Sequence, residues 1–258
     1  MIASLPMYDL PEVKGATDAW WHGLARHMGV AGELDRGPDR LAPWCNPGLA
    51  FSQTCGYPLT HAFRGKLRLL ATPHYNAPGC EAALYCSIVF AREKIELPSL
   101  RGGVAAFNTP DSMSGMLALK LVFAPYAKRG DFFSRAIQTG GHPRSMEAVQ
   151  KGEADVCAID AVTAALVRRY RPELAEGLVE IARSPKVPAL PYVTSTAQPA
   201  ARIAQLRDGL RRAFSDPSLA SAREALLLAG FSILDDAVYE RIANLEREME
   251  AAGGLVLR

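Results

Sequence analysis

The chain has 258 residues, of which 49% are hydrophobic and 22% are charged, with a formal net charge of +2. This composition is that of a globular protein with room for one large α/β domain or two smaller lobes. A nearly neutral chain without a basic run gives nucleic-acid binding no electrostatic support, because such binding needs a clustered basic face. No apolar stretch has membrane-spanning length, so direct membrane insertion is not expected.

The cysteines and the N-terminus bear on compartment and cofactors. Five cysteines without a CxxC pair predict neither a disulfide framework nor a metal site, and no cofactor is expected. Free thiols favour a reducing compartment. The N-terminal residues MIASLPMYD lack the basic, apolar and cleavage segments of a signal peptide. We therefore expect either a cytoplasmic protein or an exported one whose leader is missing from this sequence.

Short strand patterns alternate with helical patterns along the whole chain. This alternation predicts βαβ units and an α/β fold with mainly parallel sheets. Strands are predicted at Ile2–Pro6, Leu49–Gln53, Lys66–Ala71, Leu84–Ala91, Val104–Phe107, Asp155–Ile159 and Leu178–Ala182. Helices are predicted at residues 17–28, 114–122, 145–151, 203–214 and 238–249, from apolar residues at helical spacing.

Two segments are predicted to connect two lobes. The first is the apolar strand and charged stretch at 85–92, and the second is SPKVPALPYVTS at 184–195, whose three prolines favour an extended connector. The predicted first lobe is discontinuous, with residues 1–92 and 187–258. The predicted second lobe is continuous, with residues 93–186, and a ligand cleft is expected between the lobes.

The sequence FNTPDSMSGML at 107–117 predicts a strand that ends in a polar turn and then a helix. The first turn of a helix has N–H groups without intrahelical partners and carries the positive end of the helix dipole. Ser112 and Ser114 add hydroxyl donors, and Gly115 lets a ligand approach the backbone. This arrangement can hold a phosphate-like group without a metal. Simple helix capping is an equally good interpretation of the residues alone, and no nucleotide-binding P-loop pattern is present.

A second stretch, GGHPRSMEAVQKGEADVCAID at 140–160, contains two polar candidates. Two glycines place His142 on a tight loop, and a strand delivers Asp160 to its carboxyl end. In open α/β sheets, ligands bind beyond the carboxyl ends of the strands. His142 could donate to an anion, and Asp160 could accept from an amine or hydroxyl of the ligand. A lone histidine and a lone aspartate are, however, more often structural.

Three further candidates follow strands of the predicted first lobe. They are Tyr8, Gln53 and Tyr75, and the tyrosines could line a cleft with a flat face and a hydroxyl group. Ordinary packing inside the lobe is an equal alternative for each tyrosine.

Taken together, these segments resemble the phosphate, phosphite and phosphonate substrate-binding proteins of ABC transporters. The resemblance rests on SLPMYD at 4–9, SQTCGYPL at 52–59, LYCSIVFARE at 84–93, LRGGVAAFNTPDSMSG at 100–115, GGHPRSMEAVQKGEADVCAIDAV at 140–162 and PALPYVTS at 188–195. It implies a type II periplasmic-binding-protein fold, in which two α/β lobes are joined by two hinge strands and close over a ligand.

The resemblance also implies roles for individual residues. Ser112 and Ser114 match the family's Ser/Thr-Ser-Gly turn, which binds phosphoryl oxygens, and His142 matches the histidine that joins them. Asp160 matches an acidic residue that faces the amino group of the ligand in phosphonate binders. Met113 departs from the family, which usually has a small hydroxylated residue there.

The resulting functional hypothesis is a periplasmic solute-binding protein for a small oxyanion, without enzymatic activity, that serves an ABC permease. One alternative is a sensory module of the same fold, which the missing leader favours. Another is an enzyme, with Cys157 or Cys55 as nucleophile and His142 or His74 as base. No catalytic signature surrounds these residues, and the mid-strand position of Cys157 favours burial.

Overall fold

The computed structural model describes residues 2–258, which form two compact units. Unit 1 comprises residues 2–76, Glu81–Ala83 and Pro188–Val238, and unit 2 comprises Ala77–Cys80, Leu84–Val187 and Tyr239–Arg258. Each unit is an α/β layer with its own sheet and core, and each is described by itself.

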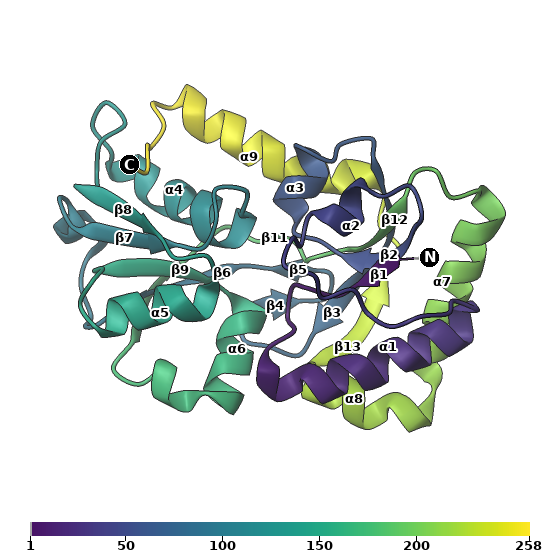
Figure 1. Ribbon diagram of the computed structural model, residues 1–258. Coiled ribbons are helices and arrows are strands. Elements are labelled where there is room, and N and C mark those ends of the chain that lie inside the picture. Colours follow the sequence, from purple (N-terminus) through teal and green to yellow (C-terminus); the bar gives the residue numbers. More distant parts are fainter. Residues whose placement is uncertain (1) are drawn as a thin grey trace. The chain divides into compact units, whose positions relative to one another are not determined.

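Unit 1 contains a five-stranded sheet in the order β1-β2-β12-β3-β13 (Figure 1). Its strands are β1 (Ile2–Ser4), β2 (Leu49–Gln53), β12 (Tyr192–Ser195), β3 (Leu67–Tyr75) and β13 (Leu228–Ser232). Strands β1 and β2 are parallel, whereas β12 runs antiparallel to both of its neighbours and β13 runs antiparallel to β3.

The helices of unit 1 bury aromatic and aliphatic side chains against this sheet. They are α1 (Lys14–Met28), α2 (Ala42–Cys45), α3 (Gly56–Thr60), α7 (Ala200–Ser215) and α8 (Ala220–Ala225), with short 3-10 turns η1 (Pro11–Val13) and η6 (Pro217–Leu219). In α1, Trp20, Leu24 and Met28 recur at helical spacing and are fully buried. Gly29 ends α1 in the left-handed conformation, with φ of 63°.

Helices α1 and α7 approach closely at Gly209. A Cβ on Gly209 would lie 2.4 Å from Cγ and 2.7 Å from Cα of Met28, and the second of these atoms is backbone. We therefore expect Gly209→Ala to lower the free energy of unfolding by about 1–3 kcal/mol, because the helices must separate. Gly15→Ala on α1 is the matched control, since nothing lies within 4 Å of the added methyl group, and it should cause no loss. Urea denaturation measures the free energy of unfolding of both variants. Equal losses of stability in Gly209→Ala and Gly15→Ala would contradict the packing argument.

Unit 2 contains the second five-stranded sheet, in the order β10-β6-β9-β7-β8. Its strands are β10 (Val179–Arg183), β6 (Ser87–Ala91), β9 (Val156–Asp160), β7 (Val104–Phe107) and β8 (Arg135–Gln138). Strands β9, β7 and β8 are parallel, whereas β6 runs antiparallel to both β9 and β10.

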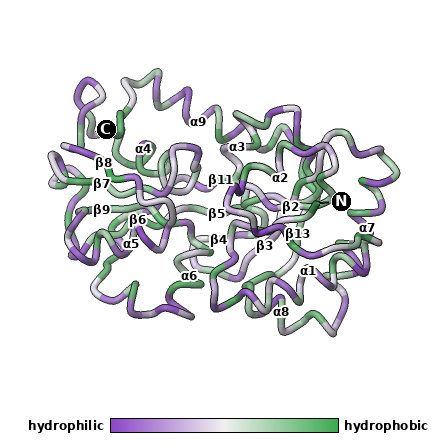
Figure 2. The backbone as a smooth tube through the Cα atoms, in the orientation of Figure 1, coloured by the Kyte–Doolittle hydropathy of each residue, from purple (hydrophilic) through white to green (hydrophobic). Residues whose placement is uncertain are grey.

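The unit 2 helices lie on both faces of this sheet, α5 and α6 on one and α4 and α9 on the other (Figure 1). They are α4 (Ala118–Phe123), α5 (His142–Gln150), α6 (Ala161–Tyr170) and α9 (Glu240–Ala251), with η2 (Leu97–Leu100), the π-helical turn η3 (Met113–Leu117), η4 (Ala124–Tyr126) and η5 (Pro172–Leu174). The turn η7 (Asp236–Tyr239) precedes α9. The core includes Phe90, Met146 and Ile159. In Figure 2, hydrophilic and hydrophobic residues alternate along α9, as expected for a helix that turns one face toward a core.

A third, small sheet has the order β11-β5-β4 and is formed where the chain passes from one unit to the other. Its strands are β11 (Val187–Pro188), β5 (Leu84–Tyr85) and β4 (Cys80–Glu81). Within residues 2–258, no helix is both long and apolar enough to cross a membrane.

The structure corrects three expectations from the sequence. The sheets are mixed rather than mainly parallel, because β6 and β12 run against their neighbours. Residues 84–92 were expected in the first lobe, but β6 pairs with β9 and β10 and so belongs to unit 2. The C-terminal residues 239–258 also belong to unit 2, where α9 packs on α4 and Val256 N–H donates to the Gly130 carbonyl. The chain therefore passes between the units a further time, before α9.

Candidate functional site

The polar turn after β7 is organised by Ser112, which is the N-cap of the helical segment that begins at Met113. Its Oγ accepts a hydrogen bond of 3.0 Å from Gly115 N–H, and its carbonyl accepts one of 3.0 Å from Leu117 N–H. Ser112 and Ser114 are both 4% exposed, and their hydroxyl oxygens are 3.5 Å apart. Ser112 Oγ accepts from Gly115 N–H and also has one proton, which can be donated to Ser114 Oγ or to a ligand.

The second loop of the site meets this turn because β7 and β8 are parallel neighbours and end at the same edge of the sheet. The Gly140 N–H donates to the Asn108 carbonyl at 2.8 Å and thereby ties the two loops together. His142 is the first residue of α5, and its Nε2 lies 2.8 Å from Ser114 Oγ. The sequence placed the start of this helix at Ser145, whereas the structure starts it three residues earlier, so His142 lies on the helix and not on the loop before it.

The arrangement of Ser112, Ser114 and His142 is suited to an oxyanion. Two hydroxyl groups and an imidazole lie beside the positive ends of two helical segments, in a partly buried place where hydrogen bonds are stronger than in water. Met113, which departs from the family pattern, is 1% exposed and adds no hydroxyl donor. In the part of the chain that the structure describes, no group of three potential metal ligands occurs.

The structure gives Gly115 a steric role that the sequence did not predict. The approach of a ligand to its backbone stays a prediction. A Cβ on Gly115 would lie 1.9 Å from Asn108 Oδ1 and 3.2 Å from the Asn108 backbone nitrogen. The missing side chain therefore makes room for the Asn108 amide. Asn108 in turn fixes the loop of His142 through its carbonyl, so Gly115 and Asn108 both shape the site from within.

Asp160 ends β9, as the sequence predicted, but its carboxylate has a structural role there. It is 1% exposed, and its Oδ1 accepts hydrogen bonds from Val162 N–H at 2.8 Å and Thr163 N–H at 3.1 Å. Asp160 is thus the N-cap of α6. Its contact with a ligand amino group stays a prediction.

We expect Asp160→Ala to lower the free energy of unfolding by about 1–2 kcal/mol, because α6 loses its cap. Asp160→Asn should retain most of the stability, since asparagine caps helices as well as aspartate does. Denaturant unfolding together with calorimetric titration of an oxyanion measures both properties. A large loss of affinity in a stable Asp160→Asn protein would support the predicted ligand contact, whereas unchanged affinity would leave Asp160 with the helix cap alone.

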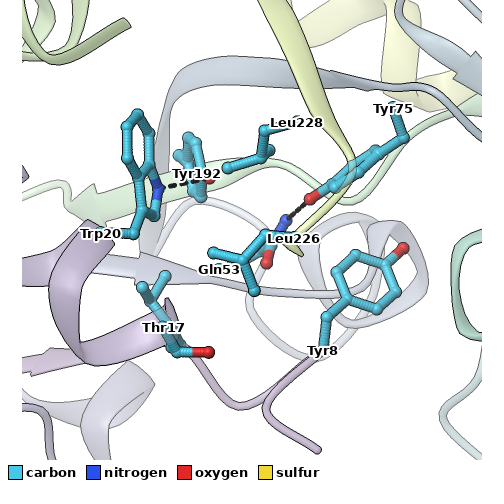
Figure 3. A pocket seen from close by; sticks show the side chains of 9 residues that line it. Tyr8, Thr17, Trp20, Gln53, Tyr75, Tyr192, Leu226 and Leu228 are labelled. Atoms are coloured by element: carbon cyan, nitrogen blue, oxygen red, sulfur yellow. Dashed lines mark hydrogen bonds between the residues drawn. The ribbon is translucent and has the colours of Figure 1, made fainter. Parts of the chain in front are cut away.

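In unit 1 the structure brings Tyr8, Gln53 and Tyr75 together (Figure 3). Gln53 Nε2 donates to Tyr75 Oη at 2.8 Å and to the Leu190 carbonyl at 3.0 Å. The rings of Tyr8 and Tyr75 meet edge to face, with centroids 5.2 Å apart. The expected first-lobe residues therefore form a cluster, and their contact with a ligand stays a prediction.

This cluster lines a pocket whose other residues the sequence interpretation missed. They are Leu5, Thr17, Trp20, Tyr192, Leu226 and Leu228. Trp20 Nε1 donates to Tyr192 Oη at 3.2 Å, and burial raises the pKa of the Tyr192 phenol, which therefore stays neutral. Within residues 2–258, the side chains that line this pocket include none with a charge. The helical spacing of apolar residues in α1 predicts that Trp20 is buried. It does not predict that Trp20 lines a pocket, because every buried helix face has the same spacing.

The cysteines and histidine considered for catalysis lie in unfavourable places. Cys157 is fully buried on β9, and burial raises the pKa of its thiol, so it is protonated near neutral pH. Cys55, the other cysteine considered, is 8% exposed and directly precedes α3. His74 lies on β3 with its Nε2 2.8 Å from Ser232 Oγ, and burial lowers its pKa. Cys157 is thus part of the unit 2 core.

The sequence was compared with known protein families and known proteins. Residues 49–239 match the family model described as the periplasmic substrate-binding protein of the phosphonate ABC transporter. No curated protein matches the sequence.

Several solved structures are similar in fold. A binding protein component of an ABC phosphonate transporter from Pseudomonas aeruginosa superposes with a TM-score of 0.81 at 18% identity, covering 98% of this chain and 87% of that one. PhnD1 from Prochlorococcus marinus, in complex with methylphosphonate, gives 0.79 at 13% identity, covering 96% and 98%. A Xanthomonas citri protein bound to ATP gives 0.72 at 20% identity, covering 97% of each chain.

These likenesses confirm the predicted fold, that of the type II periplasmic binding proteins. The family match spans most of the chain and includes both the serine turn and the His142 loop. The chain belongs to the family of periplasmic substrate-binding proteins of phosphonate ABC transporters.

Proposed function

We propose that this member of the family binds a small phosphate- or phosphonate-like oxyanion through Ser112, Ser114 and His142 of unit 2, and delivers it to an ABC permease. The observation that carries the proposal is the 2.8 Å contact between Ser114 Oγ and His142 Nε2 beside the Ser112 cap. It joins two loops into one set of donors at the carboxyl ends of the parallel strands β7 and β8, where ligands of α/β proteins bind.

The expected affinity follows from the number of donors. A hydrogen bond to a charged group contributes about 1.5–3 kcal/mol, and ordering the ligand and side chains offsets part of the sum. Three or four such bonds support a dissociation constant that is micromolar or lower, which corresponds to about −8 kcal/mol. No covalent step is needed, so the proposed activity is reversible binding without catalysis.

Unit 1 is proposed to contribute Tyr8, Gln53 and Tyr75 to ligand recognition. Their pocket is apolar apart from hydroxyl and amide groups, which suits a small uncharged substituent better than a second charge. The periplasmic location and the permease partner are proposed for this chain from its family.

A thermal-shift screen tests the proposal. The ligands are phosphate, phosphite, methylphosphonate, ethylphosphonate, sulfate and methanesulfonate, with chloride at equal ionic strength as the reference. A ligand at about 100 times its dissociation constant adds about 2.7 kcal/mol, which raises Tm by about 5–10 °C in a chain of this size. A selective shift with phosphoryl or phosphonyl ligands supports the proposal. Well-folded protein that responds to none of them would refute it.

A further inference from the structure

Arg144 occupies an unfavourable position in α5. It is the third residue of the helix, after His142 and Pro143, and the first turn has no acidic residue. A cation at the N-terminus of a helix opposes the helix dipole, which favours negative charge there. A position that breaks a local rule without visible compensation is often one that serves function.

The side chain of Arg144 extends back along the loop that carries His142. A Cβ on Gly140 would lie 3.6 Å from Arg144 Nη1, and Gly140 is the residue whose N–H donates to the Asn108 carbonyl. The guanidinium therefore lies next to the hydrogen bond between Gly140 and Asn108 that ties the two loops of the oxyanion site together.

Arg144 is an exposed residue, and Glu147, the carboxylate that feels its charge, is paired with Lys151. Across residues 2–258, its guanidinium forms neither a hydrogen bond nor an ion pair. Glu147, one turn along α5, bonds to Lys151 at 2.6 Å. That bond is the main cause of the lowered pKa of Glu147, and the charge of Arg144 contributes least.

The charge balance of the donor set explains why a cation is placed here. Ser112, Ser114 and the backbone N–H groups are neutral, and His142 carries charge only when it is protonated. A doubly charged oxyanion held by these groups alone would keep most of its charge unbalanced. We propose that Arg144 is the charge-complementing residue of this site and makes it select doubly charged phosphonates and phosphates over singly charged sulfonates. This inference rests on the proposed function.

Methylphosphonate and methanesulfonate separate charge from shape, because both are tetrahedral and carry one methyl group. Calorimetric titration is carried out above the second pKa of the phosphonate, with wild type, Arg144→Gln, Arg144→Lys and Lys151→Gln. Coulomb energy scales with the ligand charge, so a loss of about threefold for the sulfonate in Arg144→Gln implies a loss of about tenfold for the phosphonate. Arg144→Lys should keep most of the preference, and added salt should weaken phosphonate binding less in Arg144→Gln than in wild type.

Lys151→Gln removes the same charge at the other end of α5 and should change neither affinity by more than about twofold. Equal losses for both ligands in Arg144→Gln, or losses matched by Lys151→Gln, would overturn the role of Arg144 while leaving the proposed function intact. Wild-type protein that binds neither ligand would overturn both proposals.

Discussion

Replacement of Ser114 and His142 together by alanine should lower the affinity for the oxyanion by at least about a hundredfold. Each removed group takes away a charge-assisted hydrogen bond of about 1.5–3 kcal/mol, and about 1.4 kcal/mol is a factor of ten. Because Ser114 Oγ and His142 Nε2 are 2.8 Å apart, the two replacements should not be additive. The double variant should lose less than the product of the two single losses, since each residue orients the other.

Isothermal titration of the four proteins with the best ligand from the screen measures this coupling. Ser134→Ala is the matched control, since its exposed hydroxyl donates only to the Gly103 carbonyl within the described residues 2–258 and lies outside the site. It should leave affinity unchanged. An oxyanion that binds the folded double variant as tightly as the wild type would show that these two residues do not form the site.

Gly115→Ala should damage both stability and binding. The new methyl group would lie 1.9 Å from Asn108 Oδ1 and 2.8 Å from its Cγ, so either the amide or the start of the helix must move. We expect a loss of about 1–3 kcal/mol in the free energy of unfolding. Affinity should also fall by about tenfold or more, because Gly115 N–H no longer holds Ser112 Oγ in place.

Asn108→Ala combined with Gly115→Ala tests the cause of this damage. Removal of the amide takes away the two atoms closest to the new methyl group and leaves the Asn108 backbone nitrogen at 3.2 Å from it, so most of the lost stability should return. Denaturant unfolding and ligand titration of the single and double variants give both readouts. A double variant as unstable as the sum of its single variants would show that the Asn108 side chain is not what Gly115 accommodates.

The sequence predicted those elements whose signals are local. Strands β2 and β7 begin and end where their apolar runs predicted. Strand β12 was interpreted as a connector because prolines precede it, yet Tyr192–Ser195 is buried between β2 and β3. Strand β8 was missed because its residues Arg135–Gln138 have no continuous apolar run. Both strands depend on partners that are distant in sequence.

The residues of the candidate site also separate into those with a local sequence signal and those that depend on partners distant in sequence. Ser112, Ser114 and His142 could be named as candidates that lie together, because a cap, a glycine loop and a strand end are visible in short stretches of sequence. The pairing of Gly115 with Asn108 could not, because it depends on the path of a side chain in space. For Asp160 the sequence indicates no more than a general structural alternative to ligand binding, because its two backbone donors are brought to it by the fold. The assignment of residues 239–258 failed because an apolar stripe does not say which core it covers.

The most direct test of the central claim is a crystal structure of the protein grown with the oxyanion that stabilises it most. The account predicts a phosphorus atom within about 4 Å of the Ser112 and Ser114 hydroxyl oxygens, with its oxygens at hydrogen-bond distance from Ser114 or His142. An oxyanion bound elsewhere, with this set of donors empty, would contradict the account.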